Sequence, residues 1–182
     1  MQDKPTPFDD PDAAAFPEPH EIEAHAMAFA RMMFEHAGFE REVRELQDAV
    51  TREHGFGERP GNQWRARERP DRMVELIEQR HGQLPETESI KKLLDDAIEP
   101  SDQRNLLAHG TWWCFNRRTA AISVRGTTRW ESADEPPEHR DYTVADIKAL
   151  ADRFEDLAAD LYTLRREIER PWIDAQVRGE VR

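Results

Sequence analysis

The sequence has a single cysteine, Cys114, among its 182 residues. One cysteine excludes an intramolecular disulfide and a cysteine-based zinc cluster within one chain. The sequence also lacks any apolar run long enough to cross a bilayer, and its first twelve residues lack the basic and apolar regions of a signal peptide. These absences predict a protein of a reducing cytoplasm that has no contact with a membrane.

Positive charge is scarce as well, because 26 Lys and Arg face 38 Asp and Glu, for a formal net charge of −12. A protein that coats nucleic acid without regard to sequence gains its affinity by neutralising phosphates, and is therefore strongly basic. The net charge excludes that class. An enzyme that holds a few phosphates at a locally basic site remains compatible with it, because local charge can differ from the average.

The composition fits one domain, with 37% hydrophobic residues for a core and 35% charged residues for a highly charged surface. Residues 1–19 are acidic and rich in proline, and we expect them to form a disordered tail. Residues 20–171 are predicted to form a helical domain, and residues 172–182 a C-terminal tail.

Apolar residues repeat with helical periodicity in several segments of this domain. Before residue 100 these segments are 21–37, 39–50, 70–82 and 85–98. We expect Gly38 to mark a break or a kink between the first two segments, and His36 to cap a helix end. Ile98 is expected on the buried side of the fourth segment. Pro100 interrupts the pattern, Ser101 is then a suitable N-cap for a short helix, and Gly110 is a natural stop.

The next stretch has strand-like composition, and we interpret residues 112–126 as a β-hairpin with its turn at residues 116–118. An acidic loop is expected at residues 131–139. The last helix starts at Thr143 with Asp146 in a capping-box position, presents an apolar seam up to Ile168 and ends at Pro171. Together these elements predict a mainly α fold, an antiparallel helix bundle with a β-hairpin inserted before the long C-terminal helix.

Arg104, Asn105 and His109 bring together the residue types that cleave RNA without a metal. Arg is permanently cationic and its planar fork suits phosphate, whereas His exchanges a proton near neutral pH. A base removes the proton of a ribose 2′-hydroxyl, and a cation stabilises the charge that develops on the phosphate. Asn105 would orient the His or hold a phosphate oxygen. We expect neither a metal nor a cofactor.

The run Arg104-Asn105-Leu106-Leu107-Ala108-His109 resembles the signature of the HEPN superfamily, an Arg followed by a polar residue and, a few positions later, a His. The resemblance covers about residues 21–170 and implies a four-helix bundle. It also implies a homodimer whose two motifs line one cleft, and an endoribonuclease that needs no metal, often in toxin–antitoxin or antiviral systems. An antitoxin or another protein would then be a partner besides RNA.

Two interpretations of the motif stay open at this point. Arg104 could form a salt bridge with an acidic neighbour such as Asp102, and His109 could cap the C-terminus of its helix, where a cation is favoured. The chain would then be a non-catalytic interaction module that forms a helical dimer.

A basic stretch follows the motif, since residues 103–130 contain five Arg and no Asp or Glu. Arg117, Arg118 and Arg125 are candidates for RNA binding, and the alternative is that these arginines only solvate the outer face of the hairpin. The tryptophans of this stretch are expected to pack the hairpin onto the bundle, although bases can stack on such rings. Cys114 is expected to be a packed residue rather than a nucleophile.

Overall fold

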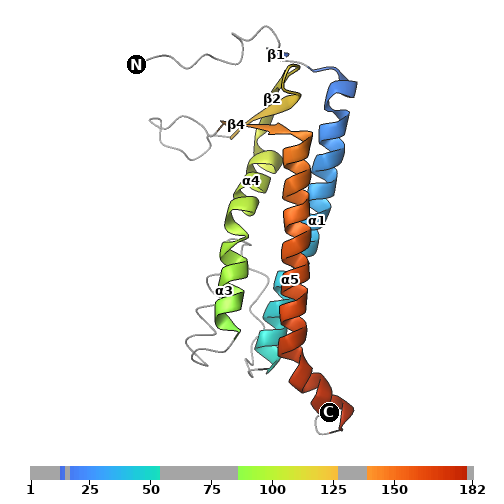
Figure 1. Ribbon diagram of the computed structural model, residues 1–182, viewed down its shortest axis with the longest axis vertical. Helices are drawn as coiled ribbons and strands as arrows, with labels where there is room; N and C mark the ends of the chain where they lie inside the picture. The colour runs from blue at the N-terminus through green and yellow to red at the C-terminus, as the bar shows by residue number, and fades with distance from the viewer. Residues whose placement is uncertain (1–12, 15–16, 54–85, 127–138, 180–182) are drawn as a thin grey trace, which may run out of the picture. The chain divides into compact units, whose positions relative to one another are not determined.

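The computed structural model describes residues 13–14, 17–53, 86–126 and 139–179 (Figure 1). The chain divides into two compact units, the first formed by Met1–Phe34 and Glu99–Arg153 and the second by Glu35–Ile98 and Phe154–Arg182. The fold is mainly helical with a small antiparallel sheet. None of the helices in the described part of the chain combines the length and the apolar character that crossing a membrane requires.

Helix α1 (Pro19–Glu53) begins where Glu21 accepts a hydrogen bond of 2.7 Å from the backbone N–H of Glu18. It continues through Gly38, so the predicted break is wrong. Its tertiary contacts outweigh the low helix propensity of a single glycine. His36 is buried inside the helix and stacks edge-on against Phe154 at 4.8 Å, so it does not cap a helix end.

Helices α3 (Thr87–Asp95) and α4 (Ile98–His109) are separated by Asp96 and Ala97, not by Pro100. Pro100 lies in the first turn of α4, where a missing N–H removes no hydrogen bond of the helix. The predicted N-cap at Ser101 is therefore wrong, because the helix has already begun. Ile98, which we expected on the buried side, is 54% exposed. The helix predicted at residues 70–82 lies outside the described residues.

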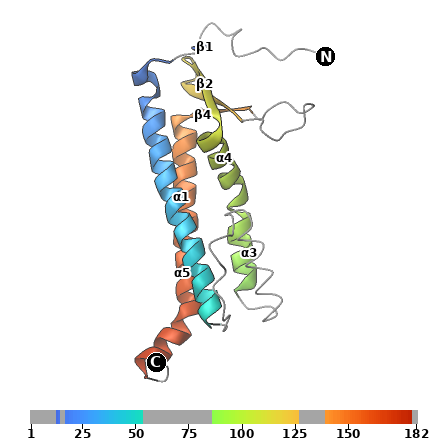
Figure 2. The same cartoon turned by 180° about the vertical axis from the view of Figure 1, so that it is seen from behind.

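The sheet contains β2 (Thr111–Asn116), β3 (Ala121–Arg125) and β4 (His139–Thr143), all antiparallel, with the two-residue strand β1 (Ala13–Ala14) beside β2. The predicted hairpin is confirmed as β2 and β3. Strand β4 was missed: His139, predicted to end a loop, begins it. Strand β2 starts directly after α4, and β4 leads directly into α5, as the two opposite views show (Figures 1 and 2).

A β-bulge in β2 lies between Trp112, which pairs with Val124, and Cys114, which pairs with Ser123. Cross-strand partners project from the same face of a sheet. The inner face therefore carries the buried row Phe115, Ile122 and Tyr142. Phe115 contacts His25 of α1 with ring centroids 5.8 Å apart, and so fixes the sheet on the helix within the first unit.

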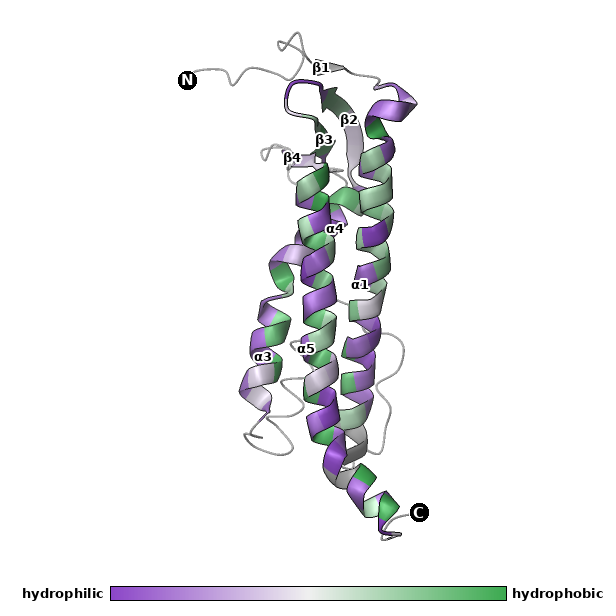
Figure 3. Ribbon diagram, turned by 45° about the vertical axis from the view of Figure 1, so that its right-hand side comes forward, coloured by the Kyte–Doolittle hydropathy of each residue, from purple (hydrophilic) through white to green (hydrophobic). Residues whose placement is uncertain are grey.

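Helix α5 (Val144–Val177) starts at the predicted capping box, in which Thr143 and Asp146 exchange hydrogen bonds of 2.8 and 3.2 Å. The hydroxyl of Thr143 also donates a hydrogen bond of 2.7 Å to the carboxylate of Asp146. This bond and the one from the backbone N–H of Thr143 lower the pKa of Asp146, because they favour its charged form. The predicted seam is confirmed, and Figure 3 shows the alternation of hydrophobic and hydrophilic residues along the helix. The buried seam residues are Ile147, Leu150, Phe154, Leu157, Leu161, Leu164 and Ile168. The predicted end at Pro171 is wrong, because the helix continues to Val177.

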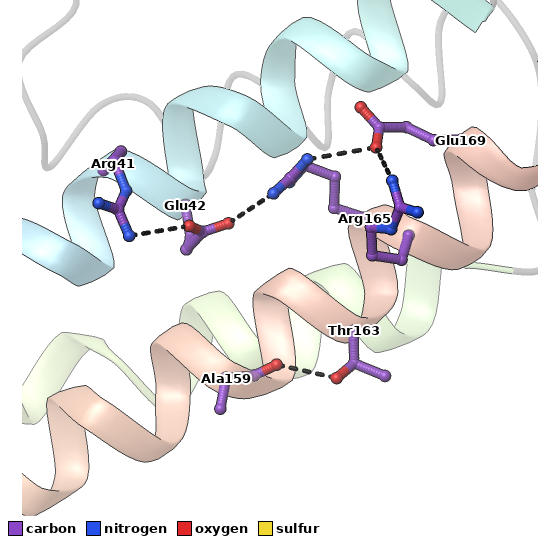
Figure 4. A network of polar contacts seen from close by, with 7 residues as sticks. Arg41, Glu42, Ala159, Thr163, Arg165 and Glu169 are labelled. Carbon is purple, nitrogen blue, oxygen red and sulfur yellow. Dashed lines mark hydrogen bonds and ion pairs between the residues drawn. The ribbon is translucent and has the colours of Figure 1, made fainter. Parts of the chain in front are cut away.

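In the second unit, α1 and α5 are joined by an ionic network (Figure 4). Arg165 of α5 lies 3.2 Å from a carboxylate oxygen of Glu42 in α1 and 3.2 Å from one of Glu169, one turn further along α5. Glu42 and Glu169 are 6% and 8% exposed. Two nearly buried carboxylates therefore share one guanidinium, with the exposed Arg41 and Arg166 at the rim.

Candidate functional site

Arg104 lies in the middle of α4 and is half-buried. Its Nη1 donates a hydrogen bond of 2.8 Å to Oδ1 of the neighbouring Asn105. No carboxylate of the described residues pairs with Arg104, Asp102 included, and its Nε is buried without an acceptor among them. Asn105 therefore restrains the guanidinium, while most of its donors stay available for a ligand anion.

His109 is the last residue of α4, and its side chain is exposed. It forms no hydrogen bond or ion pair with another residue of the described ranges. The backbone N–H of Gly110 donates to the carbonyl of Leu106 at 2.8 Å and so closes the last turn of the helix without help from a side chain. The exposed imidazole is therefore open to a ligand from solvent.

Gly110 allows the end of α4 to lie directly against strand β3. A Cβ atom built on it would lie 2.4 Å from the carbonyl oxygen of Leu106, 2.7 Å from Val124 and 2.9 Å from the carbonyl oxygen of Arg125. No side chain fits there, so the requirement for glycine is steric. This contact fixes His109, the preceding residue, beside the end of β3.

Both Arg104 and His109 lie within regular α-helix. Five residues rotate the direction of the side chain by about 140° and advance it by about 7.5 Å. No hydrogen bond joins the two residues in the described structure. Helix α4 alone thus does not direct both side chains to the same face, although it does end at His109 as predicted.

The arginines predicted to bind RNA lie at opposite ends of the hairpin. Arg117 and Arg118 lie at its tip, where Asn116 accepts hydrogen bonds from the turn backbone. Arg125 ends β3 next to Gly110 and is exposed. The four-residue rise from residue 121 to residue 125 already separates the ends by about 13 Å.

Arg117 is engaged by a partner of its own chain. Its Nε lies 2.5 Å from a carboxylate oxygen of Glu21 in α1, and its Nη2 lies 3.2 Å from the other. This bidentate contact lowers the pKa of Glu21 to about 2 and raises that of Arg117. Of the three predicted arginines, Arg117 therefore has a structural role in holding the hairpin tip on α1.

The tryptophans of β2 divide between the two faces. Trp112 points inward, donates its indole N–H to the carbonyl of Leu107 at 2.9 Å and meets Phe29 edge-on at 5.4 Å. This is the packing role predicted for the tryptophans. Trp113, the bulge residue, is half-buried and contacts His139 of β4 with ring centroids 5.9 Å apart. Cys114 is buried, in agreement with the prediction that it is packed.

Sequence analysis missed His139 and its neighbours. Asp141 accepts a hydrogen bond of 2.5 Å from the hydroxyl of Ser123 and lies 3.7 Å from Nε2 of His139. Only Tyr142 of β4 is fully buried, so the strand has no apolar alternation and resembles a polar loop in sequence. In the sequence, the only signal near His139 was the acidic Asp141 two residues later. This spacing indicates a contact only once both residues are known to lie in one strand.

Within the described ranges, no three His, Cys, Asp or Glu side chains gather as ligands of a metal ion would. No family model, no curated protein and no solved structure matches the chain.

Proposed function

We propose that the protein is a metal-independent endoribonuclease of the HEPN type that acts as a dimer. The observation that carries the proposal is that neither Arg104 nor His109 is bound in an ion pair within the described residues. The competing structural role, a salt bridge from Arg104 to Asp102, thereby loses its support. A cationic fork and an exposed imidazole are the two groups that such a cleavage needs.

In the proposed mechanism, His109 takes the proton of a ribose 2′-hydroxyl as the 2′-oxygen attacks the adjacent phosphorus. The bond from phosphorus to the 5′-oxygen breaks, and the 5′-oxygen leaves with a proton from an acid. Arg104 binds the non-bridging oxygens, whose charge rises in the transition state. Asn105 acts on Arg104 as a positioning residue through the bond of 2.8 Å between their side chains.

The arrangement of α4 supports a dimer. The two side chains diverge by about 140° around the helix axis, so one straight helix does not direct both to the same face. Two copies related by a twofold axis would bring Arg104 of one chain near His109 of the other. The proposed site is therefore composite, with one residue from each copy.

The test is cleavage of single-stranded RNA by the purified protein in EDTA. His109→Ala is expected to lower the rate by about 10²–10⁴-fold, the usual contribution of a general acid or base. Arg104→Ala is expected to lower it by about 10²–10³-fold, as for loss of one group that stabilises the developing charge. Asn105→Ala should cost less, because Asn105 only positions Arg104.

Two exposed residues of α1 serve as matched controls, His20→Ala for the histidine and Arg44→Ala for the arginine. Both should cleave at the wild-type rate. If the wild type does not cleave RNA, or if the His109 and Arg104 variants cleave as fast as it does, the proposed activity is wrong.

A second candidate function is a non-catalytic interaction module, with an antitoxin or another protein as partner. Met27 and Phe34 favour it, because they are 69% and 75% exposed and lie two turns apart on one side of α1. If this module is correct, Phe34→Ser should abolish self-association or partner binding, whereas the His109 and Arg104 variants should have no phenotype.

A further inference from the structure

We propose that the outer face of the sheet beside His109 is a subsite for one nucleotide of single-stranded RNA, with Arg125 as its phosphate contact and the Trp113–His139 pair as its base contact. This inference rests on the proposed function, because it names a surface on which the RNA of that site would lie. Sequence analysis grouped Arg125 with Arg117 and Arg118, whereas the fold separates Arg125 from them.

The register of the strands places a cation and an imidazole on one face of the sheet. Thr111, Arg125 and His139 are direct cross-strand partners, so they form one row that projects from one face of the sheet, here called the outer row. Arg125 is exposed, and it forms no ion pair with another described residue. The side chain of His139 is 40% exposed. The outer row therefore offers a cation and an imidazole side by side.

The bulge in β2 brings Trp113 to the same face of the sheet as His139. Trp113 is on β2 and His139 is on β4, with β3 between them, yet their rings lie 5.9 Å apart. They can meet only by reaching across β3 on the face that carries Arg125. Bulges commonly re-aim a side chain in this way. Ser123, which shares this face of β3 with Arg125, is 5% exposed, as expected if the ring pair lies over it.

The outer row lies beside the proposed catalytic histidine. Gly110 packs against the backbone of Arg125, and His109 directly precedes Gly110 in the chain. A strand of RNA with its phosphate at His109 would place the next nucleotide over this face. Arg125 supplies charge complementary to its phosphate, and an aromatic pair can stack on a base of any sequence.

Among the described strand residues of this face Asp141 is the only carboxylate, and we assign it the role of positioning His139. It lies 3.7 Å from Nε2 of His139 and accepts the hydroxyl of Ser123 at 2.5 Å. The hydroxyl of Ser123 fixes the carboxylate of Asp141, and this carboxylate in turn lies beside the imidazole of His139. Asp141 is thus engaged within the sheet, whereas Arg125 forms no ion pair with another described residue.

The experiment is binding of a fluorescent 2′-O-methyl oligoribonucleotide, which cannot be cleaved because it lacks the 2′-hydroxyl, measured by anisotropy at pH 8 and several salt concentrations. Arg125→Ala should weaken binding about tenfold and lower the slope of log K against log salt by about 0.7, the value for one lost phosphate contact of a single strand. His139→Ala should weaken binding about five- to tenfold with the slope unchanged, as for lost stacking.

The matched control is Arg44→Ala, an exposed arginine of α1 with no assigned role in RNA binding, which should bind within twofold of the wild type at low salt. Circular dichroism melts confirm that each variant is folded. Equal losses in the Arg125 and Arg44 variants would mean diffuse attraction and overturn the subsite, as would unchanged binding in the Arg125 and His139 variants, or no binding by the wild type.

The outcomes for binding and for cleavage are independent. Specific binding by the outer row together with no cleavage of ordinary RNA would refute the proposed activity and leave the subsite standing. Cleavage that depends on His109, together with binding indifferent to Arg125 and His139, would refute the subsite and leave the activity standing.

Discussion

Gly110 and Gly38 show how differently two glycines in or beside helices can be constrained. At Gly110 a methyl group would collide with two carbonyl oxygens and Val124, whereas at Gly38 it would meet nothing within 4 Å. We expect Gly110→Ala to destabilise the protein by about 1–3 kcal/mol or more, the cost of overpacking. Gly38→Ala should stabilise it by about 0.5–1 kcal/mol through helix propensity.

Urea unfolding of both variants measures these effects. The opposite signs are the essential result, since the substitution is the same and only its surroundings differ. A stable Gly110→Ala variant would mean that the end of α4 does not lie against β3, and the position of His109 would then need revision.

His25 makes the first unit sensitive to acid. It is buried against Phe115, and burial lowers its pKa, although backbone groups of Tyr142 and Ala120 oppose the shift. The folded protein therefore keeps His25 neutral at a pH where the unfolded chain already binds a proton. Stability should be full above pH about 6.5 and should fall as the pH drops from there to the lowered pKa of the folded state.

The measurement is the midpoint of urea unfolding between pH 8 and pH 5. His25→Leu should clearly reduce the fall in stability over this range, whatever its effect on absolute stability, and the exposed His20→Ala should keep the wild-type slope. The Glu21–Arg117 pair does not interfere, because its contribution is lost only below pH about 4.5, as Glu21 approaches its pKa of about 2. An unchanged slope in His25→Leu would contradict the assignment.

At the scale of elements, the network around Arg165 ties α1 to α5 in the second unit. Arg165→Met leaves Glu42 and Glu169 nearly buried without their shared cation, and should destabilise the protein by about 3 kcal/mol or more. Replacing all three residues by Met removes the charges together and should recover most of the loss. Equal stability of the single and triple variants would show that the buried charges were not coupled.

Periodic elements were predictable from the sequence because their pattern is local. The seam of α5 and its capping box at Thr143 follow from residues three or four positions apart, and the hairpin follows from alternation around a turn. At Gly38 the failure has a physical cause, since the buried His36 and Phe39 lie beside it and a helix that gains enough from tertiary packing continues through a weak helix former. The continuation past Pro171 has no such explanation, because the described residues after it are not buried.

The candidate site was predictable only in part, for the same reason. The chemical types of Arg104 and His109 are visible in the sequence, but their lack of ion-pair partners in the described structure is not. Strand β4 forms because β3 offers a pairing edge, so His139 could not be associated with Trp113 from composition. Contacts between residues distant in sequence decided what local patterns left open.

At the scale of the whole molecule, a composite site predicts complementation between inactive variants. Arg104→Ala and His109→Ala should each be inactive alone. A mixture allowed to exchange subunits would contain heterodimers with one intact pair, Arg104 from one chain and His109 from the other, and should regain up to about a quarter of the wild-type activity. This fraction follows from random pairing, in which half of the dimers are mixed and each has one of two sites intact.

RNA cleavage in EDTA measures the recovery, and light scattering measures the mass of the assembly. A mixture that stays inactive although the subunits exchange would place both residues of a site in the same chain, and α4 would then have to bend on binding RNA. The net charge of −12 adds an expectation, since RNA should bind only where arginines gather locally.

The bulge in β2 lets the strand keep Trp112 and Phe115 in the core while it adds Trp113 to the outer face of the sheet. Trp112 and Phe115 both face inward, and two residues, Trp113 and Cys114, lie between them. In a regular strand a single residue separates two side chains on the same face. Deleting Trp113 as a whole residue would restore regular alternation and leave the inner face in phase. This position can therefore be lost or gained as a single codon without disturbing the fold, so a surface feature can be added to an existing core by changing chain length alone.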